Sequence, residues 1–193
     1  MTRIVGGQAR GRRLVTPSGD ATRPTSNRAR EALFSSLESE RGSWAGTAFL
    51  DLFAGSGAIG LEAASRGAAP VVLVESERAA WHACRENVAT LRLPDVSLHR
   101  ADVLTFLAAA AERPFDVVFA DPPYAFGADS VTQVLTLLAR HRWVDADATV
   151  VLERASRDAP LEWPDGYAPL RERRYGEATL WFGRRSRPAG EEG

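Results

Sequence analysis

The hydrophobic positions of this chain fall into two kinds of segment that follow one another in turn from residue 47 to residue 153. Short apolar runs that end at glycine, proline or acidic positions are typical of buried strands, whereas apolar residues spaced three and four apart indicate helices. The predicted strands are Thr47–Phe53, Pro70–Glu75, Val96–Arg100, Phe115–Ala120 and Ala148–Glu153, and the predicted helices are Ala58–Arg66, Glu77–Leu91, Val103–Ala111 and Ser130–His141. Their alternation predicts an α/β domain with a doubly wound, largely parallel sheet and helices on both of its faces.

Beyond residue 153 the pattern changes to two runs, Leu170–Tyr175 and Ala178–Phe182, on either side of Gly176. This spacing predicts a hairpin that closes the sheet. The segment that follows, residues 184–193, is polar and contains one proline and two glycines, which favours a disordered tail. We therefore expect the main domain to cover residues 23–183.

A short arm precedes this domain and covers residues 1–22. Ile4-Val5 and Leu14-Val15 lie on either side of a glycine pair, which predicts a two-stranded hairpin. Two strands alone are marginally stable in water, so we expect the arm to be mobile until it meets a partner. Thr25 or Ser26 can then cap the first helix of the main domain.

Composition limits the class of protein. A chain of 193 residues, of which 45% are hydrophobic and 25% charged, is long enough for one α/β domain with a substantial core. No apolar stretch is long enough to span a bilayer and no apolar signal core is present, so we expect a cytoplasmic protein without a membrane segment. The single cysteine, Cys84, excludes an intramolecular disulfide, and the three histidines have no ligand-like spacing, so we predict no metal.

Charge is distributed unevenly. Residues 1–30 contain seven arginines and one acidic residue, Asp20, and so carry +6, whereas the whole chain carries −1. The chain contains no lysine, so a general preference for arginine explains the choice of base but not the scarcity of acids in this segment. Arginines that contact phosphates would give affinity for nucleic acid without sequence specificity. The alternative is a solvated basic arm that binds nothing.

A glycine-rich turn joins the first predicted strand of the domain to the helix that follows. It has the spacing Gly55-x-Gly57-x-x-Gly60, and Glu75 lies about 20 residues further on, at the end of the next strand. Glycines let the backbone approach a ligand, a helix N-terminus offers unpaired N–H groups, and the acid can accept bonds from two ribose hydroxyls. The pattern fits nicotinamide-dependent and S-adenosylmethionine-dependent enzymes equally. Alternatively, the glycines only allow tight packing of helix on sheet.

A second motif, Asp121-Pro122-Pro123-Tyr124, directly follows a buried strand. Ligands of open α/β sheets bind beyond the carboxyl ends of the strands, so this motif and the glycine turn should face one crevice. The prolines have no N–H, so the Asp121 carboxylate and the Pro122 carbonyl can accept both hydrogens of an exocyclic amine. Tyr124 is positioned to stack on a base that has left its helix. The alternative is a loop in which two prolines merely end a strand.

These motifs carry a family resemblance. The sequence DLFAGSGAIG at residues 51–60 resembles the first motif of class I S-adenosylmethionine-dependent methyltransferases, and the motif at Asp121 resembles their amino-methylating (D/N)PP(Y/F) motif. The stretches RIVGGQxRGR at residues 3–12 and RPTxxRxRExLF at residues 23–34 resemble the RsmD family, bacterial enzymes that methylate the N2 amine of a guanine in 16S ribosomal RNA. The similarity runs from about Arg3 to Phe182. It implies a Rossmann-like fold with a mostly parallel, seven-stranded sheet, and S-adenosylmethionine as cofactor.

The resemblance also implies site residues. The cofactor-binding residues would be Asp51, Phe53, Gly55, Ser56, Gly57, Gly60, Glu75, Asp102 and Val103. The catalytic residues would be Asp121, Pro122, Pro123 and Tyr124. The RNA-binding residues would be Arg3, Arg10, Arg12, Arg13, Arg23, Thr25 and Arg28. In this scheme Glu75 holds the ribose and Asp102 with Val103 takes the adenine, although Asp102 is equally suited to cap the following helix.

Three alternatives stay open at this point. A nicotinamide-dependent oxidoreductase explains the glycine turn but gives the motif at Asp121 no role. A methyltransferase acting on another nucleic acid or on a protein amide more often has Asn at the position of Asp121 and usually carries an added recognition domain. A catalytically silent RNA-binding assembly factor would not need the intact motifs. We expect a monomer whose partner is ribosomal RNA, either naked or within an assembling small subunit.

Overall fold

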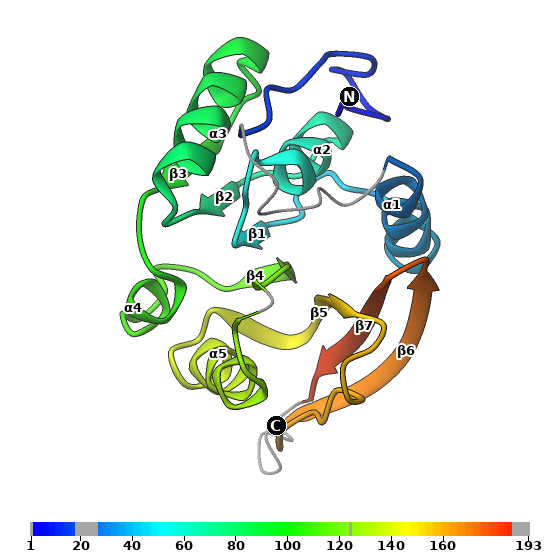
Figure 1. Ribbon diagram of the computed structural model, residues 1–193, viewed down its shortest axis with the longest axis vertical. Coiled ribbons are helices and arrows are strands. Elements are labelled where there is room, and N and C mark those ends of the chain that lie inside the picture. Colours follow the sequence, from blue (N-terminus) through cyan, green and yellow to red (C-terminus); the bar gives the residue numbers. More distant parts are fainter. Residues whose placement is uncertain (1, 18–26, 124, 187–193) are drawn as a thin grey trace.

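The computed structural model describes residues 2–17, 27–123 and 125–186 (Figure 1). The elements within these ranges, in chain order, are α1 (Asn27–Arg41), β1 (Phe49–Leu52), α2 (Ala58–Arg66), β2 (Val71–Val74), α3 (Arg78–Leu91), β3 (Val96–His99), α4 (Val103–Leu107), β4 (Phe115–Ala120), α5 (Ala128–Arg140), β5 (Val144–Ala155), β6 (Tyr167–Tyr175) and β7 (Ala178–Arg185). The predicted alternation of strands and helices is confirmed.

The seven strands form one sheet in the order β3-β2-β1-β4-β5-β7-β6. The first five strands are parallel, and β7 pairs antiparallel with both β5 and β6. The strand order reverses between β1 and β4, which are neighbours with Leu52 opposite Ala120. We call the edge where the parallel strands end the carboxyl edge and the opposite one the amino edge. Both predicted motifs begin where β1 and β4 reach the carboxyl edge.

Helices cover both faces of the sheet (Figure 1). Side chains of α1, α2 and α3 pack with one face in a core that includes Phe34, Leu61 and Cys84. Side chains of α4 and α5 pack with the other face in a core that includes Leu107 and Leu135. This two-sided burial explains why β1, with all four residues buried, is apolar on both faces apart from one acid.

One helix, α4, and three strands, β5, β6 and β7, have a bound that differs from the predicted one by three residues or more, and the other predicted elements differ by two or fewer. The predicted helix Val103–Ala111 ends at Leu107, because the indole N–H of Trp143 donates to the carbonyls of Leu107 (3.2 Å) and Ala109 (3.0 Å), so the backbone turns away. Strand β5 begins four residues earlier than predicted, at Val144. Strand β6 begins at Tyr167 rather than at Leu170. Strand β7 includes Arg184 and Arg185, so the prediction that the tail begins at residue 184 is wrong.

The N-terminal arm is not a free hairpin. In residues 2–17, its two sides form no regular ladder but a single β-bridge, between Arg3 and Arg13, flanked by backbone hydrogen bonds such as those from Ile4 to Arg12 and from Leu14 to Thr2. Three of its apolar side chains pack in the core that α1, α2 and α3 share, with Ile4 fully inaccessible and Ala9 and Leu14 nearly so, whereas Val15 is exposed. The expectation of a mobile arm is therefore wrong for the described residues 2–17.

Buried polar side chains hold the arm in place. The Glu62 carboxylate on α2 accepts the backbone N–H groups of Val5 and Gly6, each at 2.7 Å. The same carboxylate lies 3.6 Å from the guanidinium of Arg30, and both of these side chains are fully buried. On α3, the Asn87 amide donates to the Val15 carbonyl (2.8 Å) and accepts its N–H (2.8 Å). A charge buried in this way must stay paired, so the arm is part of the folded domain.

Candidate active site

The glycine turn and the loop after β4 meet at the carboxyl edge. The Phe53 ring meets the Phe126 ring edge-on, with the centroids 5.0 Å apart. The Phe126 N–H donates to the Pro123 carbonyl at 2.7 Å, so the chain turns directly after the two prolines. Phe53 adopts a positive φ of 60°, which non-glycine residues rarely do, so the chain bends sharply as it leaves β1. The predicted convergence of the two motifs is confirmed.

The three glycines of the turn differ in their surroundings. A Cβ on Gly57 would lie 2.7 Å from the sulfur of Cys84, and a Cβ on Gly60 would overlap the Leu73 side chain. Gly57 is therefore required by close packing against α3, and Gly60 by close packing of α2 against β2. Gly55 has a φ of +57° and nothing within 4 Å of where a Cβ would stand. Open space at this one glycine is where a ligand could approach the backbone.

Glu75 is built into the same turn. Its carboxylate accepts the Gly55 N–H at 2.7 Å through one oxygen and the Glu77 N–H at 2.7 Å through the other. The residue is 7% exposed. Each carboxylate oxygen can accept about two hydrogen bonds, so the group keeps capacity for the ribose hydroxyls that the sequence predicts.

Asp51 lies beneath the turn, inside β1. Its carboxylate accepts the Gly60 N–H at 2.8 Å and so anchors the first turn of α2. Burial raises the pKa of Asp51 to about 7; the bond from Gly60 opposes this rise and the nearby charge of Glu75 adds to it. The side chain is 1% exposed, so its observed partner is the helix backbone. Contact with a cofactor stays a prediction for this residue.

Asp121 follows the last residue of β4 and is partly exposed. Burial raises the pKa of its carboxyl well above the usual range, and the charges of Glu153 and Asp51 raise it further. Glu153 lies beside it because Ala120 and Leu152 are paired in register and the next residues are Asp121 and Glu153. Sequence reasoning missed Glu153 as a site residue. The available signal was an acid at the end of the strand predicted next after β4.

The remaining cofactor residues predicted from the sequence lie on the same edge. The Asp102 carboxylate accepts the Thr105 N–H at 3.0 Å and caps α4, so the capping interpretation is confirmed. Val103 is buried in the core beneath it. The Ser56 carbonyl accepts a bond from Asn87 at 2.9 Å, which links the glycine turn to the residue that holds the arm. A role of these residues in cofactor binding stays a prediction.

The predicted RNA-binding arginines are spread along two elements. Arg3, Arg10, Arg12 and Arg13 are exposed on the arm, and Arg28 is exposed in the first turn of α1. Three further predicted residues, Tyr124, Arg23 and Thr25, lie outside the described residues. In residues 2–17, 27–123 and 125–186, no helix is long and apolar enough to cross a membrane. The same ranges contain no group of three or more His, Cys, Asp or Glu side chains that could hold a metal.

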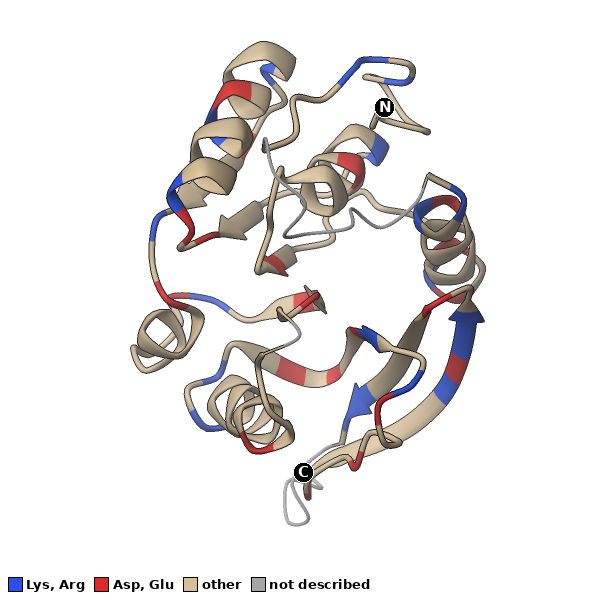
Figure 2. Cartoon of the chain, viewed as in Figure 1, with Lys and Arg blue, Asp and Glu red and all other residues tan. Residues whose placement is uncertain are grey.

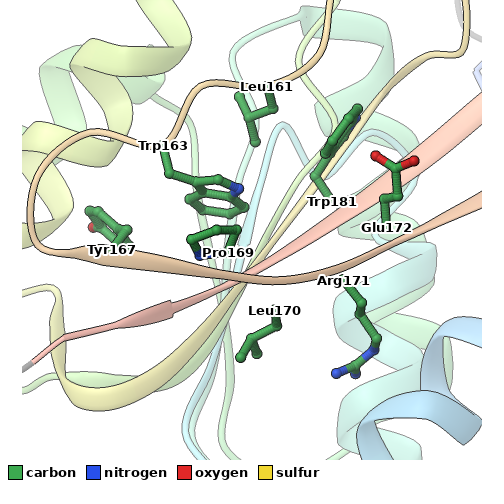
Figure 3. A pocket seen from close by; sticks show the side chains of 8 residues that line it. All are labelled: Leu161, Trp163, Tyr167, Pro169, Leu170, Arg171, Glu172 and Trp181. Carbon is green, nitrogen blue, oxygen red and sulfur yellow. The ribbon is translucent and has the colours of Figure 1, made fainter.

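A separate cavity of about 430 Å³ lies at the hairpin of β6 and β7 (Figure 3). Its wall is aromatic, with Trp163 and Trp181 on one side of β6, whereas Arg171 extends from the other side. Trp163 packs where a Cβ on Gly183 would be, which explains the glycine in β7. None of the residues predicted to bind cofactor lines this cavity.

Comparison with solved structures identifies the class of fold. The structure with the description "Putative methyltransferase yhhF from Escherichia coli" superposes with a TM-score of 0.83 at 33% identity, covering 96% of this chain and 98% of that one. The Thermus thermophilus hypothetical protein TTHA0928 superposes with a TM-score of 0.77 at 37% identity, covering 94% and 98%. The fold is that of a Rossmann-like methyltransferase.

Sequence comparison identifies the family. A family model described as Conserved hypothetical protein 95 matches residues 2–184. The ribosomal RNA small subunit methyltransferase D of Escherichia coli K12 is 35% identical over 177 residues, which is 92% of this chain and 86% of that protein. The protein of the same name from Haemophilus influenzae is 35% identical over 185 residues, covering 90% and 89%. The chain belongs to this family, the RsmD family, and is a methyltransferase.

Proposed function

We propose that this enzyme transfers a methyl group from S-adenosylmethionine to the exocyclic N2 amine of a guanine in 16S ribosomal RNA, and that it does so in the cytoplasm. The observation that carries this proposal is the shared carboxyl edge, where the open backbone at Gly55, the ribose-type acceptor Glu75 and the amine-type acceptor Asp121 stand at adjoining strand ends. The family adds that the relatives named above are ribosomal RNA methyltransferases.

The residues present fit this cofactor. Asp51 and Asp121 are carboxyl groups whose pKa values are raised, mainly by burial, and a positive charge nearby would favour their ionised forms. The sulfonium of S-adenosylmethionine is such a charge. Glu75 would hold the ribose, Asp102 and Val103 the adenine, and the backbone at Gly55 the methionine part. When bound, the cofactor supplies an electrophilic methyl group on a good leaving group.

The chain itself supplies position and charge. Pro122 and Pro123 leave the loop without donors, so the Asp121 carboxylate and the Pro122 carbonyl accept the two hydrogens of the amine. Holding both hydrogens favours a pyramidal nitrogen whose lone pair points away from these acceptors. Positioning two reactants in this way can contribute on the order of 7–11 kcal/mol to lowering the barrier.

Asp121 also interacts with the positive charge that develops on the nitrogen. Its carboxylate stabilises the positive charge as the new bond forms. The proton becomes acidic only at that stage, so no strong base is needed before the attack. Because the pKa of Asp121 is raised, its carboxylate is a better proton acceptor than an ordinary aspartate.

The other activities weighed above have less support. An oxidoreductase would be foreign to a family of methyltransferases, and it leaves Asp121 unexplained. A silent assembly factor would not require an acceptor pair without N–H groups at a strand end. Transfer to another amine on RNA or protein uses the same loop and differs only in the substrate, so the experiment must identify the modified atom.

The test is transfer of a labelled methyl group to 16S ribosomal RNA from cells that lack this enzyme, as naked RNA and as small-subunit particles. The proposal predicts one modified guanine, and mass spectrometry of nuclease fragments should find the label on N2. Label on adenine, on a ring nitrogen or on protein alone would contradict it. RNA from cells that contain the enzyme is the matched control and should accept little label.

A further inference from the structure

The hairpin of β6 and β7 brings basic side chains to the same edge as the catalytic loop. In the register of the sheet, Glu153 of β5 pairs with Leu180 of β7, and Leu180 pairs with Arg173 of β6. Since Glu153 lies beside Asp121, Arg173 stands in the same row, three strand spacings or about 14 Å away. Arg174 is the next residue toward the end of β6. The end of this hairpin therefore flanks the crevice.

Three arginines around this hairpin are paired with acids. Arg171 and Arg184 both pair with Glu40 of α1. Arg154 of β5 pairs with Asp158 at 3.3 Å.

Arg173 and Arg174 differ from these arginines. Both are exposed, and their guanidinium groups contact only backbone carbonyls, of Glu172 at 3.5 Å and of Gly176 at 3.3 Å. Within the described part of the chain, neither forms an ion pair. Figure 2 shows the basic positions at the end of β6, next to α1.

The arm arginines lie in a different place. The Gln8 N–H donates to the Ser65 carbonyl near the end of α2, and Arg12 donates to the Thr90 carbonyl near the end of α3. Both helices begin at the carboxyl edge and end at the amino edge, so the tip of the arm is remote from Asp121. Figure 2 shows the arm beyond α2, away from β6. The arginines at the tip of the arm are therefore too far from Asp121 to bind the phosphates next to the reacting base, and other residues must do so.

Arg28, in contrast to the tip of the arm, lies toward the carboxyl edge. Helix α1 ends at the amino edge, where Arg41 is 3.7 Å from Asp116 at the start of β4. Its first turn, which carries the exposed Arg28, therefore points toward the carboxyl edge.

We propose that Arg173 and Arg174, together with Arg28, bind the RNA phosphates that flank the reacting guanine, at the carboxyl edge and remote from the tip of the arm. This proposal rests on the proposed function. Guanidinium groups suit the role because they pair with phosphate oxygens through two parallel hydrogen bonds and are always charged. Groups already paired with acids, such as Arg171, do not take part.

The test compares two double variants of the full chain. Arg173→Gln/Arg174→Gln removes the proposed contacts, and Arg113→Gln/Arg140→Gln removes two equally exposed arginines at the amino edge. Each phosphate contact contributes roughly 0.7–0.9 to the slope of log affinity against log salt, so the first variant should reduce that slope by about 1.4–1.8. Its binding to naked ribosomal RNA should weaken by roughly tenfold or more at 0.1 M salt. The control variant should keep the wild-type slope and affinity.

The outcomes separate this proposal from the function on which it rests. Cofactor binding and thermal unfolding of both variants should match those of the wild type, since Arg173 and Arg174 contact only backbone carbonyls. A wild-type slope for Arg173→Gln/Arg174→Gln would overturn the phosphate contacts while leaving methyl transfer by the wild type intact. Normal binding to naked RNA with loss of binding to the subunit particle would also overturn them and indicate a ribosomal protein. Absence of methyl transfer by the wild type would refute the function itself.

Discussion

The glycine-turn half of the crevice and the Asp121 half are held by different kinds of interaction. In the first, the carboxylates of Asp51 and Glu75 accept backbone N–H groups from the turn and from the helices that follow it. In the second, Asp121 stands at a strand end beside Glu153, and its pKa is raised by burial and by the charge of Glu153. The fold organises the glycine-turn half, the proposed cofactor half, with its own backbone. In the proposed function, the Asp121 half, or amine half, is completed by the positive charge of the cofactor and by a substrate that donates hydrogen bonds.

The contrast extends to the basic residues. Arg30 and Arg66 are paired with acids beneath the arm, where they hold the structure together. Arg173 and Arg174 make no such pairs and are exposed at the carboxyl edge. A charge that is already paired contributes to folding, and one that is unpaired and exposed is available to a ligand. Counting arginines in the sequence does not distinguish the two.

The largest effect should follow from removing the acceptor in the amine half. Asp121→Ala should lower the rate of methyl transfer by on the order of 10²–10³ at saturating cofactor and RNA, as expected when a group that stabilises developing charge is lost. Cofactor affinity should change far less, because the glycine-turn half is independently held. Single-turnover kinetics and calorimetry measure the two quantities. Near-normal transfer with intact cofactor binding would remove Asp121 from the mechanism.

The cofactor half makes a prediction about stability and pH. The pKa of Asp51 is raised to about 7 in the folded protein, so its contribution to stability is complete below the ordinary aspartate pKa and is lost as the pH rises toward 7. Asp51→Asn keeps an acceptor for the Gly60 N–H and removes this loss. Relative to wild type, the free energy of unfolding of the cofactor-free variant should rise by on the order of 3 kcal/mol between pH 4 and pH 8. Parallel pH curves for the two proteins would show that Asp51 does not titrate in this way.

The glycines offer a matched pair within one turn. Gly60→Ala should destabilise the fold by about 1–3 kcal/mol, because the new methyl group overlaps the Leu73 side chain. Gly55→Ala places its methyl group in open space, so the loss of stability should be smaller and reflect mainly the positive φ. Cofactor affinity should instead fall most for Gly55→Ala. Chemical denaturation measures the stability of both variants, and calorimetry measures their cofactor affinity. Equal losses of cofactor affinity would mean that the ligand does not approach the backbone at Gly55 more closely than at Gly60.

The smallest effect concerns Glu153. Since Asp121 must be ionised to accept both hydrogens of the amine, activity should fall as the pH decreases through its raised pKa. Glu153→Gln removes a neighbouring negative charge and should move this acid limb of the pH–rate profile to lower pH. Glu172→Gln, at an exposed position on β6, is the control and should leave the limb in place. An unmoved limb in Glu153→Gln would show that Glu153 does not influence Asp121.

The sequence predicted what depends on local pattern. The bounds of α2 and β4 were predicted to the residue, because the glycine turn and the two prolines mark them. The end of α4 could not be foreseen, because it depends on Trp143, which is distant in the sequence. The indole N–H of Trp143 donates to the carbonyls of Leu107 and Ala109. The docking of the arm could not be foreseen either, because it depends on Glu62. Sequence pattern alone would place an acidic residue of a helix in solvent.

The candidate site divides in the same way. Glu75 and Asp121 were found because each stands at a strand end next to a turn motif. Gly57 and Gly60 match a ligand-binding fingerprint, yet what surrounds them is Cys84 and Leu73, and only the packed fold distinguishes them from Gly55. Glu153 was missed because no motif marks it, and its importance comes from strand order, which places β5 beside β4.

The proposed mechanism requires the cofactor and the amine to bind side by side, with the amine held between the Asp121 carboxylate and the Pro122 carbonyl. The most direct measurement is a crystal structure of the enzyme with S-adenosylhomocysteine and an RNA fragment that contains the modified guanine. We predict an Asp121 carboxylate oxygen within hydrogen-bonding distance of the guanine N2, about 2.7–3.2 Å, with the ribose of the cofactor product on Glu75. A carboxylate turned away from the base, or a cofactor product bound elsewhere than between Gly55 and Glu75, would contradict it.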